Sequence, residues 1–106
     1  MEGLKGFQKR FLRGLAHPLK PVVFVGQKGF TQSLADAMNE ALDHHELVKV
    51  KFIEFKEKQK KLAIVEQIEK TLPCQMVGLV GHIAPFSRQQ CDPEKRKIYL
   101  PEYADG

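Results

Sequence analysis

The sequence predicts an α/β domain in which helices pack on a mixed sheet of four strands. Three observations favour this fold. Segments with the apolar spacing of amphipathic helices alternate with short apolar runs typical of strands. Proline and glycine separate these segments. The chain has 106 residues and 42% apolar content, which suffices for one core without disulfide or metal support. We therefore expect one domain over residues 1–106, in the order helix, strand, helix, strand, helix, strand, strand.

The first predicted helix covers residues 3–15 and is amphipathic. Its apolar residues fall on one face: Leu4, Phe7, Phe11, Leu12 and Leu15. Its basic residues fall on the other: Lys5, Lys9, Arg10 and Arg13. Pro18 disfavours helical geometry at His17, so the helix should end by Ala16. The linker after it should run extended into the first strand.

The first strand and the loop after it carry the strongest functional signal. Residues 22–25 are all apolar and predict a short buried strand. The strand leads into Gly26-Gln27-Lys28-Gly29, a Gly-x-x-Gly segment whose glycines permit a positive φ and bring bare backbone close to a ligand. Thr31 begins and caps the next helix, whose remaining free N–H groups and positive dipole end favour an anion. With the charge of Lys28 added, the segment predicts a clamp for nucleic-acid backbone that reads no base.

A Gly-x-x-Gly segment is a weak signal by itself, because many turns with two glycines only connect elements. The segment is not a nucleotide-triphosphate loop, since it lacks Gly-Lys-Ser/Thr and its glycines are too close together. It is not a dinucleotide fingerprint either, since that motif needs three glycines. The clamp and the simple turn both stay open at this point.

The middle of the chain predicts a helix, a strand and another helix. Residues 31–44 form a helix with an acidic outer side and a buried stripe: Leu34, Ala35, Met38, Ala41 and Leu42. Residues 47–55 alternate like a half-buried strand, with Lys49 and Lys51 toward solvent or RNA. Residues 57–72 form a lysine-rich helix that Pro73 ends, and its apolar face is Leu62, Val65, Ile68 and Leu72.

The last part of the chain predicts two strands and a tail. Residues 75–80 and 83–86 read as strands separated by Gly81-His82. From residue 89 to residue 106 the sequence is a polar extension, interrupted by the apolar triplet Ile98-Tyr99-Leu100. We expect this triplet to dock back on the body of the domain.

The charge distribution points to an anionic partner. The net charge is +4 and the sequence pI is about 9.1. Basic residues gather before Phe30, in residues 49–61, and at Arg88 with residues 95–97. The hypothesis is that these three blocks converge on one face.

Cysteine and histidine usage gives no sign of a metal site or of catalysis. Cys74 and Cys91 lack metal-ligand spacing, and no secretory or transmembrane segment is visible, so we expect reduced thiols in the cytoplasm, with Cys74 buried and structural. His17 and the pair His44-His45 lack a third ligand or an orienting carboxylate, which favours capping or packing. Cys74 lies in an apolar run without a group that would activate its thiol. We therefore expect no enzyme, no metal and no cofactor.

Several blocks in order make the chain resemble a known family. They are Gln8-Lys9-Arg10-Phe11-Leu12-Arg13-Gly14-Leu15-Ala16-His17, Pro18 to Pro21, Val25-Gly26-Gln27-Lys28-Gly29, Ala41-Leu42, His45-Glu46-Leu47-Val48-Lys49-Val50-Lys51 and Val80-Gly81-His82-Ile83. Over nearly its whole length the chain resembles the CRM domain family (chloroplast RNA splicing and ribosome maturation), in particular the small bacterial proteins that consist of one such domain. The resemblance implies a fold similar to the C-terminal domain of translation initiation factor three.

The resemblance also implies RNA binding and association with precursors of the large ribosomal subunit, without catalysis. The family's loop is likened to the backbone clamp of KH domains. The RNA-binding residues expected here are Gly26, Gln27, Lys28, Gly29, Thr31, Lys20, Lys9, Arg10, Arg13, Lys49, Lys51 and Arg88. The last strand departs from the usual apolar-Tyr-Arg ending, because it reads Ala84-Pro85-Phe86-Ser87-Arg88. Pro85 lacks a ladder donor and fits best on an edge strand or at a bulge.

Two functional hypotheses follow. The first is a monomeric RNA-binding assembly factor that grips ribosomal RNA through the loop and the basic helix, with no membrane and no small-molecule substrate. The second is a protein-interaction module whose basic face meets an acidic ribosomal protein or translation factor. No aromatic platform for reading bases is visible, because the phenylalanines are spaced like core residues and tryptophan is absent.

Overall fold

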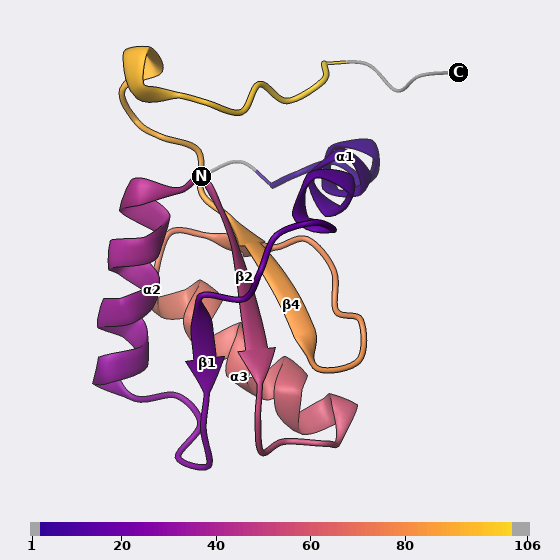
Figure 1. Ribbon diagram of the computed structural model, residues 1–106, viewed down its shortest axis with the longest axis vertical. Helices are drawn as coiled ribbons and strands as arrows, with labels where there is room; N and C mark the ends of the chain where they lie inside the picture. The colour runs from indigo at the N-terminus through magenta and orange to yellow at the C-terminus, as the bar shows by residue number, and fades with distance from the viewer. Residues whose placement is uncertain (1–2, 103–106) are drawn as a thin grey trace.

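The computed structural model describes residues 3–102, and Figure 1 shows their arrangement. The elements are α1 (Gly6–Ala16), β1 (Val23–Val25), α2 (Gln32–His44), β2 (Leu47–Phe52), α3 (Lys58–Thr71), β3 (Gln75–Met76), β4 (Ile83–Ser87) and the short 3₁₀ helix η1 (Pro93–Lys95). The predicted α/β fold with a mixed four-stranded sheet is confirmed. The strand order is β1-β2-β4-β3, with β1 parallel to β2 and the other neighbours antiparallel.

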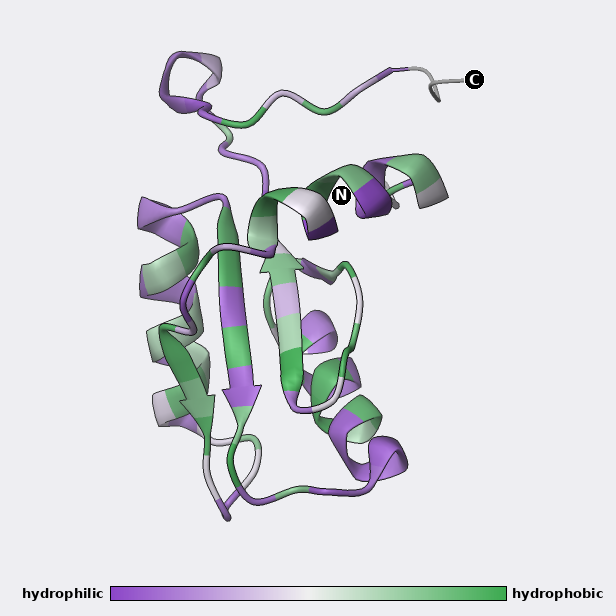
Figure 2. Ribbon diagram, turned by 45° about the vertical axis from the view of Figure 1, so that its right-hand side comes forward, coloured by the Kyte–Doolittle hydropathy of each residue, from purple (hydrophilic) through white to green (hydrophobic). Residues whose placement is uncertain are grey.

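Helices cover the two faces of the sheet unequally. On one face, α2 and α3 enclose the main core, where Met38, Val50, Ile68 and Phe86 are fully buried. On the other face, α1 buries Leu12 and Ala16 against Leu47 of β2 and Val77. Leu47 is the first residue of β2, so α1 covers only one end of the sheet, as Figures 1 and 2 show. Farther along this face Phe24 and Lys51 are exposed, whereas Pro85 of β4 is buried.

The uncovered face corrects the prediction of a buried first strand. β1 is an edge strand in which Val23 and Val25 point into the core, whereas Phe24 is 52% exposed and the preceding Val22 is 55% exposed. A run of apolar residues does not distinguish one buried face from two. β1 is therefore half-buried, and it presents a large aromatic ring to solvent.

The predicted apolar face of the third helix is also partly wrong. Leu62 is 38% exposed, whereas Ile64 and Lys61 are buried. The Lys61 ammonium donates to the Gly81 carbonyl at 2.7 Å. A charged hydrogen bond thus joins α3 to the turn between β3 and β4, where Gly81 has a φ of +58°.

Pro85 lies in the interior strand β4, opposite Lys49, and not at the expected edge or bulge. The Lys49 carbonyl accepts from the Val22 amide, so the backbone groups of Lys49 face β1, and those of Pro85 face away from β2 toward β3. On that side the Pro85 carbonyl accepts from the Val77 amide at 2.9 Å. The reciprocal bond to the Val77 carbonyl is impossible for a proline. Arg13 Nη1 takes that position and donates to the carbonyl at 2.8 Å.

The C-terminal extension contacts the α1 end of the molecule. Ile98 and Leu100 pack against the small cluster under α1. The buried Glu46 carboxylate accepts from the amides of Gln90 at 3.1 Å and Ile98 at 3.0 Å, and also from the Lys97 amide. Burial alone would raise the pKa of Glu46, but these hydrogen bonds and Arg96 leave the pKa lower than its ordinary value. The last predicted residues of the extension, 103–106, lie outside the described residues.

Candidate nucleic-acid interface

The Gly-x-x-Gly segment forms a tight turn at the end of β1. The Gly29 amide donates to the Gly26 carbonyl at 3.0 Å, which places the exposed Gln27 and Lys28 at the tip. Gly29 has a φ of +67°, and a Cβ there would lie 3.4 Å from the Phe55 ring. Gly26 does not have a positive φ, and a Cβ there would meet nothing within 4 Å. Only the second glycine is therefore required by the backbone.

The turn leads directly into the N-terminus of α2. Thr31 Oγ1 accepts from the Leu34 amide at 3.1 Å, so the predicted cap is present. Among the described contacts, the amides of Gln27, Lys28, Gln32 and Ser33 have no hydrogen-bond acceptor within the chain. Several backbone donors thus surround the turn at the positive end of a helix dipole.

A groove of about 610 Å³ begins at this turn. It runs between β1 and α2, and its lining residues are Val22, Val23, Phe24, Gly26, Gln27, Lys28, Gly29, Thr31, Ser33, Leu34 and Ala37. Part of the groove lining is therefore apolar, and Lys28 of the turn supplies a cation at one end of the groove. An anionic chain with an apolar portion matches this lining.

The basic side of α1 does not adjoin the turn. Figure 1 shows α1 across one end of the sheet and the turn at the opposite end of β1. Lys9 lines a separate pocket with Glu69 and Pro73, while Arg10 and Lys20 are exposed. The hypothesis that the basic blocks converge on one face is therefore wrong for α1 and the turn.

Two more of the expected RNA-binding cations are held by hydrogen bonds within the fold. The Arg13 guanidinium bonds the Val77 carbonyl, as described above. The Lys49 ammonium donates to the carbonyls of His17 at 3.1 Å and Leu19 at 2.9 Å, so it fixes the linker after α1 instead of meeting solvent freely. Lys51 is different, because it is exposed on the open face between Phe24 of β1 and Ile83 of β4.

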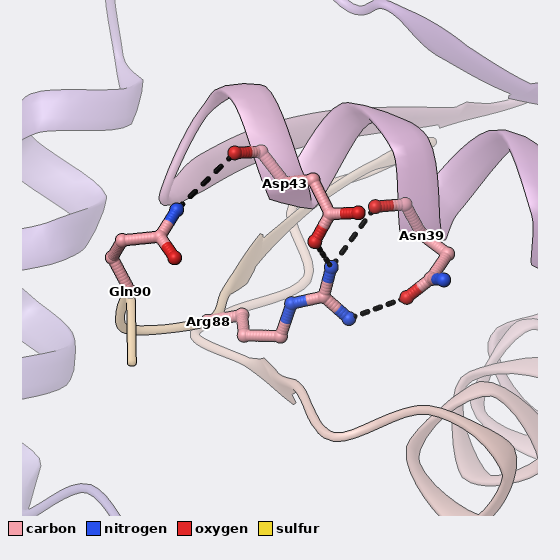
Figure 3. Close-up of polar contacts among 4 residues, drawn as sticks. All are labelled: Asn39, Asp43, Arg88 and Gln90. Atoms are coloured by element: carbon pink, nitrogen blue, oxygen red, sulfur yellow. Dashed lines mark hydrogen bonds and ion pairs between the residues drawn. The ribbon is translucent and has the colours of Figure 1, made fainter. Parts of the chain in front are cut away.

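Arg88 is held on the opposite side of the sheet from this open face, against α2. Its guanidinium donates to Asn39 Oδ1 at 2.6 Å, to the Asn39 carbonyl at 2.9 Å and to Asp43 Oδ1 at 2.8 Å (Figure 3). The Gln90 side chain donates to the Asp43 carbonyl next to it. Asn39 and Asp43 lie in the C-terminal half of α2, roughly 15 Å along the helix axis from the turn. We therefore withdraw Arg88 from the candidate interface and assign it to joining β4 to α2.

Phe24 is the residue at this site that the sequence analysis missed. The expectation that no aromatic residue is available for bases rested on core-like spacing, and Phe24 stands between two valines of an apolar run. Its position on an edge strand decides its exposure, and strand order is not visible in the local sequence. Phe24 is also among the residues that line the groove beginning at the turn.

The described residues hold a buried cysteine and no cluster of metal ligands. Burial raises the pKa of the Cys74 thiol to about 11, so the thiolate that a nucleophile needs is scarce at neutral pH. Within residues 3–102, no three His, Cys, Asp or Glu side chains are grouped to hold a metal ion. No helix in the same residues is long and apolar enough to span a bilayer.

Fold and site together define a class: an α/β domain with a mixed sheet, one half-open face and a cationic Gly-x-x-Gly turn before a helix. The model of the CRS1 / YhbY (CRM) domain matches residues 4–88. The chain belongs to this family, as its sequence blocks indicate.

Relatives along the full length carry names that refer to RNA. A Haemophilus influenzae protein named as an RNA-binding protein is 39% identical over 101 residues, which cover 95% of this chain and 98% of that protein. YqeI of Bacillus subtilis, named as a probable RNA-binding protein, is 34% identical over 98 residues, which cover 92% of this chain and 99% of YqeI. The solution structure of SAV1595 from Staphylococcus aureus, a hypothetical protein proposed to bind RNA, matches with a TM-score of 0.80 and 26% identity over 93% of this chain and 100% of that one.

Proposed function

We propose that this protein binds RNA by gripping its backbone at the Gly-x-x-Gly turn, and that it assists assembly of the large ribosomal subunit by associating with its precursors. The observation that carries the backbone grip is the exposed cationic turn at the mouth of a groove, beside amides with no acceptor among the described residues. Family membership and the names of the relatives support RNA as the partner. The ribosomal assignment follows the family resemblance.

The chemistry of the turn suits a single phosphate group better than an acidic protein whose carboxylates are spread over a wide surface. Backbone amides without an acceptor and one ammonium lie in the same short turn, and the start of α2 adds its dipole. The open backbone at Gly26 leaves room for close approach of a bulky sugar-phosphate chain. The turn itself carries one ammonium, so we expect a modest number of phosphate contacts.

The test is the salt dependence of RNA binding. If about three phosphates are engaged, log K should fall with log salt with a slope of roughly −2 to −3. Lys28→Ala should weaken binding at every salt concentration and reduce the slope by about 1. The matched control is Lys95→Ala, which removes the same charge from the exposed η1 at the other end of the molecule. Equal effects of the two variants would contradict a specific clamp.

Gly26→Ala tests the backbone approach without straining the fold. A methyl group there meets no protein atom, so stability should change by less than about 0.5 kcal/mol. It would stand between the amides and an incoming phosphate, and RNA affinity should fall. Gly29→Val is a poorer probe, because the positive φ and the Phe55 contact make it destabilising by itself.

The ribosomal part needs a cellular measurement. The protein should sediment with large-subunit precursors in a sucrose gradient, and nuclease treatment should release it. Retention after complete RNA digestion would favour the protein-interaction hypothesis. Crosslinking in cells and sequencing of the attached RNA would then identify the segment bound.

A further inference from the structure

We propose that Phe24 and Lys51 form a stacking platform for an unpaired nucleobase of the RNA whose backbone lies at the turn. The inference rests on the proposed RNA binding and adds the class of RNA: a single-stranded segment beside the gripped phosphate. Its first support is that Phe24 lines the same groove as residues 26–29. Base and phosphate contacts would therefore lie on adjacent parts of the same edge strand.

The register of the sheet places Phe24 in a row with a cation. Phe24 pairs with Lys51 on β2, and Lys51 pairs with Ile83 on β4. Their neighbours Val23, Val50 and Ala84 point into the core on the α2 and α3 side, so this row faces the other way, onto the uncovered face. The row therefore runs apolar, cationic, apolar across three strands.

The next row along the same face repeats the pattern. Lys49 pairs with Pro85, and its carbonyl accepts from the Val22 amide on the other side. Neither row contains an acidic side chain. The Phe24 row is the exposed one, because in the second row Pro85 is buried and the Lys49 ammonium is bonded to the linker after α1. The face thus combines exposed apolar surface with positive charge, which complements a nucleotide with its aromatic base and anionic phosphate.

The exposed ring selects the kind of RNA. A phenyl group has no hydrogen-bonding atom. On this edge strand 52% of Phe24 is exposed, so a large apolar surface is left in contact with water. Bases inside a duplex are already stacked and offer no free face, whereas bases of single strands stack on aromatic side chains. The geometry therefore favours an unpaired nucleotide over a helix, and it contributes affinity without reading base identity.

The experiment compares two RNA probes, a short oligouridine and a blunt GC-rich RNA duplex of equal length, at one salt concentration. Phe24→Leu keeps an apolar side chain but removes the ring, and Phe24→Tyr keeps the ring. Phe24→Leu should weaken oligouridine binding roughly 5- to 50-fold and change duplex binding less than about twofold. Phe24→Tyr should bind both probes like the original protein, and ultraviolet crosslinking to oligouridine should map to the peptide containing Phe24.

The outcomes separate this inference from the backbone grip. An unchanged oligouridine affinity in Phe24→Leu, or an equal loss on both probes, overturns the platform while a loss in Lys28→Ala still supports the grip. Failure of the unaltered protein to bind either probe overturns both proposals. Phe24→Leu alters an exposed side chain, and thermal unfolding checks that the variant folds. Lys51 is also exposed, and Lys51→Gln is a second variant that should weaken oligouridine binding more than duplex binding.

Discussion

The two ends of the sheet use their charged residues in opposite ways. At the α1 end, Arg13, Lys49 and Glu46 all make hydrogen bonds to backbone groups distant in sequence. At the other end, Gln27 and Lys28 are exposed in the turn, and within residues 3–102 their side chains make no hydrogen bond or ion pair. Charge therefore stabilises the fold at one end and is available to a ligand at the other.

The contrast explains why counting basic residues overestimates the interface. A lysine or arginine that bonds backbone carbonyls within the fold must give up these hydrogen bonds before it can bind a phosphate. Arg13, Lys49 and Arg88 are in this position. Lys28 and Lys51 lose nothing in the fold when they bind an anion. Free donors, and not net charge, mark the candidate site.

The largest effect on the α1 end is expected from Glu46→Gln. The amide group would direct an N–H toward backbone amides that now share a carboxylate, so at least one donor would be left unsatisfied. Charged hydrogen bonds of this kind contribute about 1.5–3 kcal/mol, and the cost should appear as undocking of the C-terminal extension. Hydrogen exchange of residues 89–102 measures it. Unchanged protection would show that the apolar contacts of Ile98 and Leu100 suffice.

Acid should produce the same undocking without a mutation. The folded-state pKa of Glu46 is lowered, so its stabilising contribution is complete above the ordinary value of 4.5 and is lost as pH falls through the folded pKa. Protection of the extension should therefore fall below pH 4.5 in the original protein and show a weaker pH dependence in Glu46→Gln. Parallel profiles for the two proteins would remove Glu46 as the group responsible.

The second effect in size is expected from Arg13→Met. The methionine keeps apolar bulk near Gly78 but leaves the buried Val77 carbonyl, which faces the proline, without a donor. Such a loss costs about 1–3 kcal/mol in the free energy of unfolding. The control is Arg10→Met on the exposed side of the same helix, with a change within about 0.5 kcal/mol.

A double-mutant cycle sharpens this result. Pro85→Val restores an N–H that can reach the Val77 carbonyl, so Arg13→Met should cost less in that background. Denaturant unfolding of the four proteins gives the coupling energy. Additive costs would mean that Arg13 does not substitute for the missing ladder donor.

The sequence predicted the elements and the fold well, because these depend on local periodicity. The apolar stripe of α2 and the alternation of β2 each predict which face is buried. The Thr31 cap is also predictable, because the threonine bonds an amide only three residues away. Element ends shifted by a few residues where strands finish early, as at Phe52. Resemblance to the family, and not periodicity, supplied the expected partner.

The site was predicted less well, because it depends on strand order and on partners distant in sequence. The exposure of Phe24 follows from the edge position of β1, and the use of Arg88 follows from contacts with α2 more than forty residues away. Pro85 could have indicated one contact of the fold. A donor missing from an interior strand requires a replacement, and the basic side of the first helix was available to supply one.

The smallest effect on stability is expected from Lys28→Ala, in contrast to the cations that make hydrogen bonds within the fold. The side chain is exposed and has no partner among the described residues, so the free energy of unfolding should change by less than about 0.5 kcal/mol. The same variant should give one of the clearest losses of RNA affinity. Denaturant unfolding and RNA titration on one protein preparation test both expectations. A substantial loss of stability would mean that Lys28 serves the fold as Arg13 does, and the distinction between the two ends of the sheet would fail.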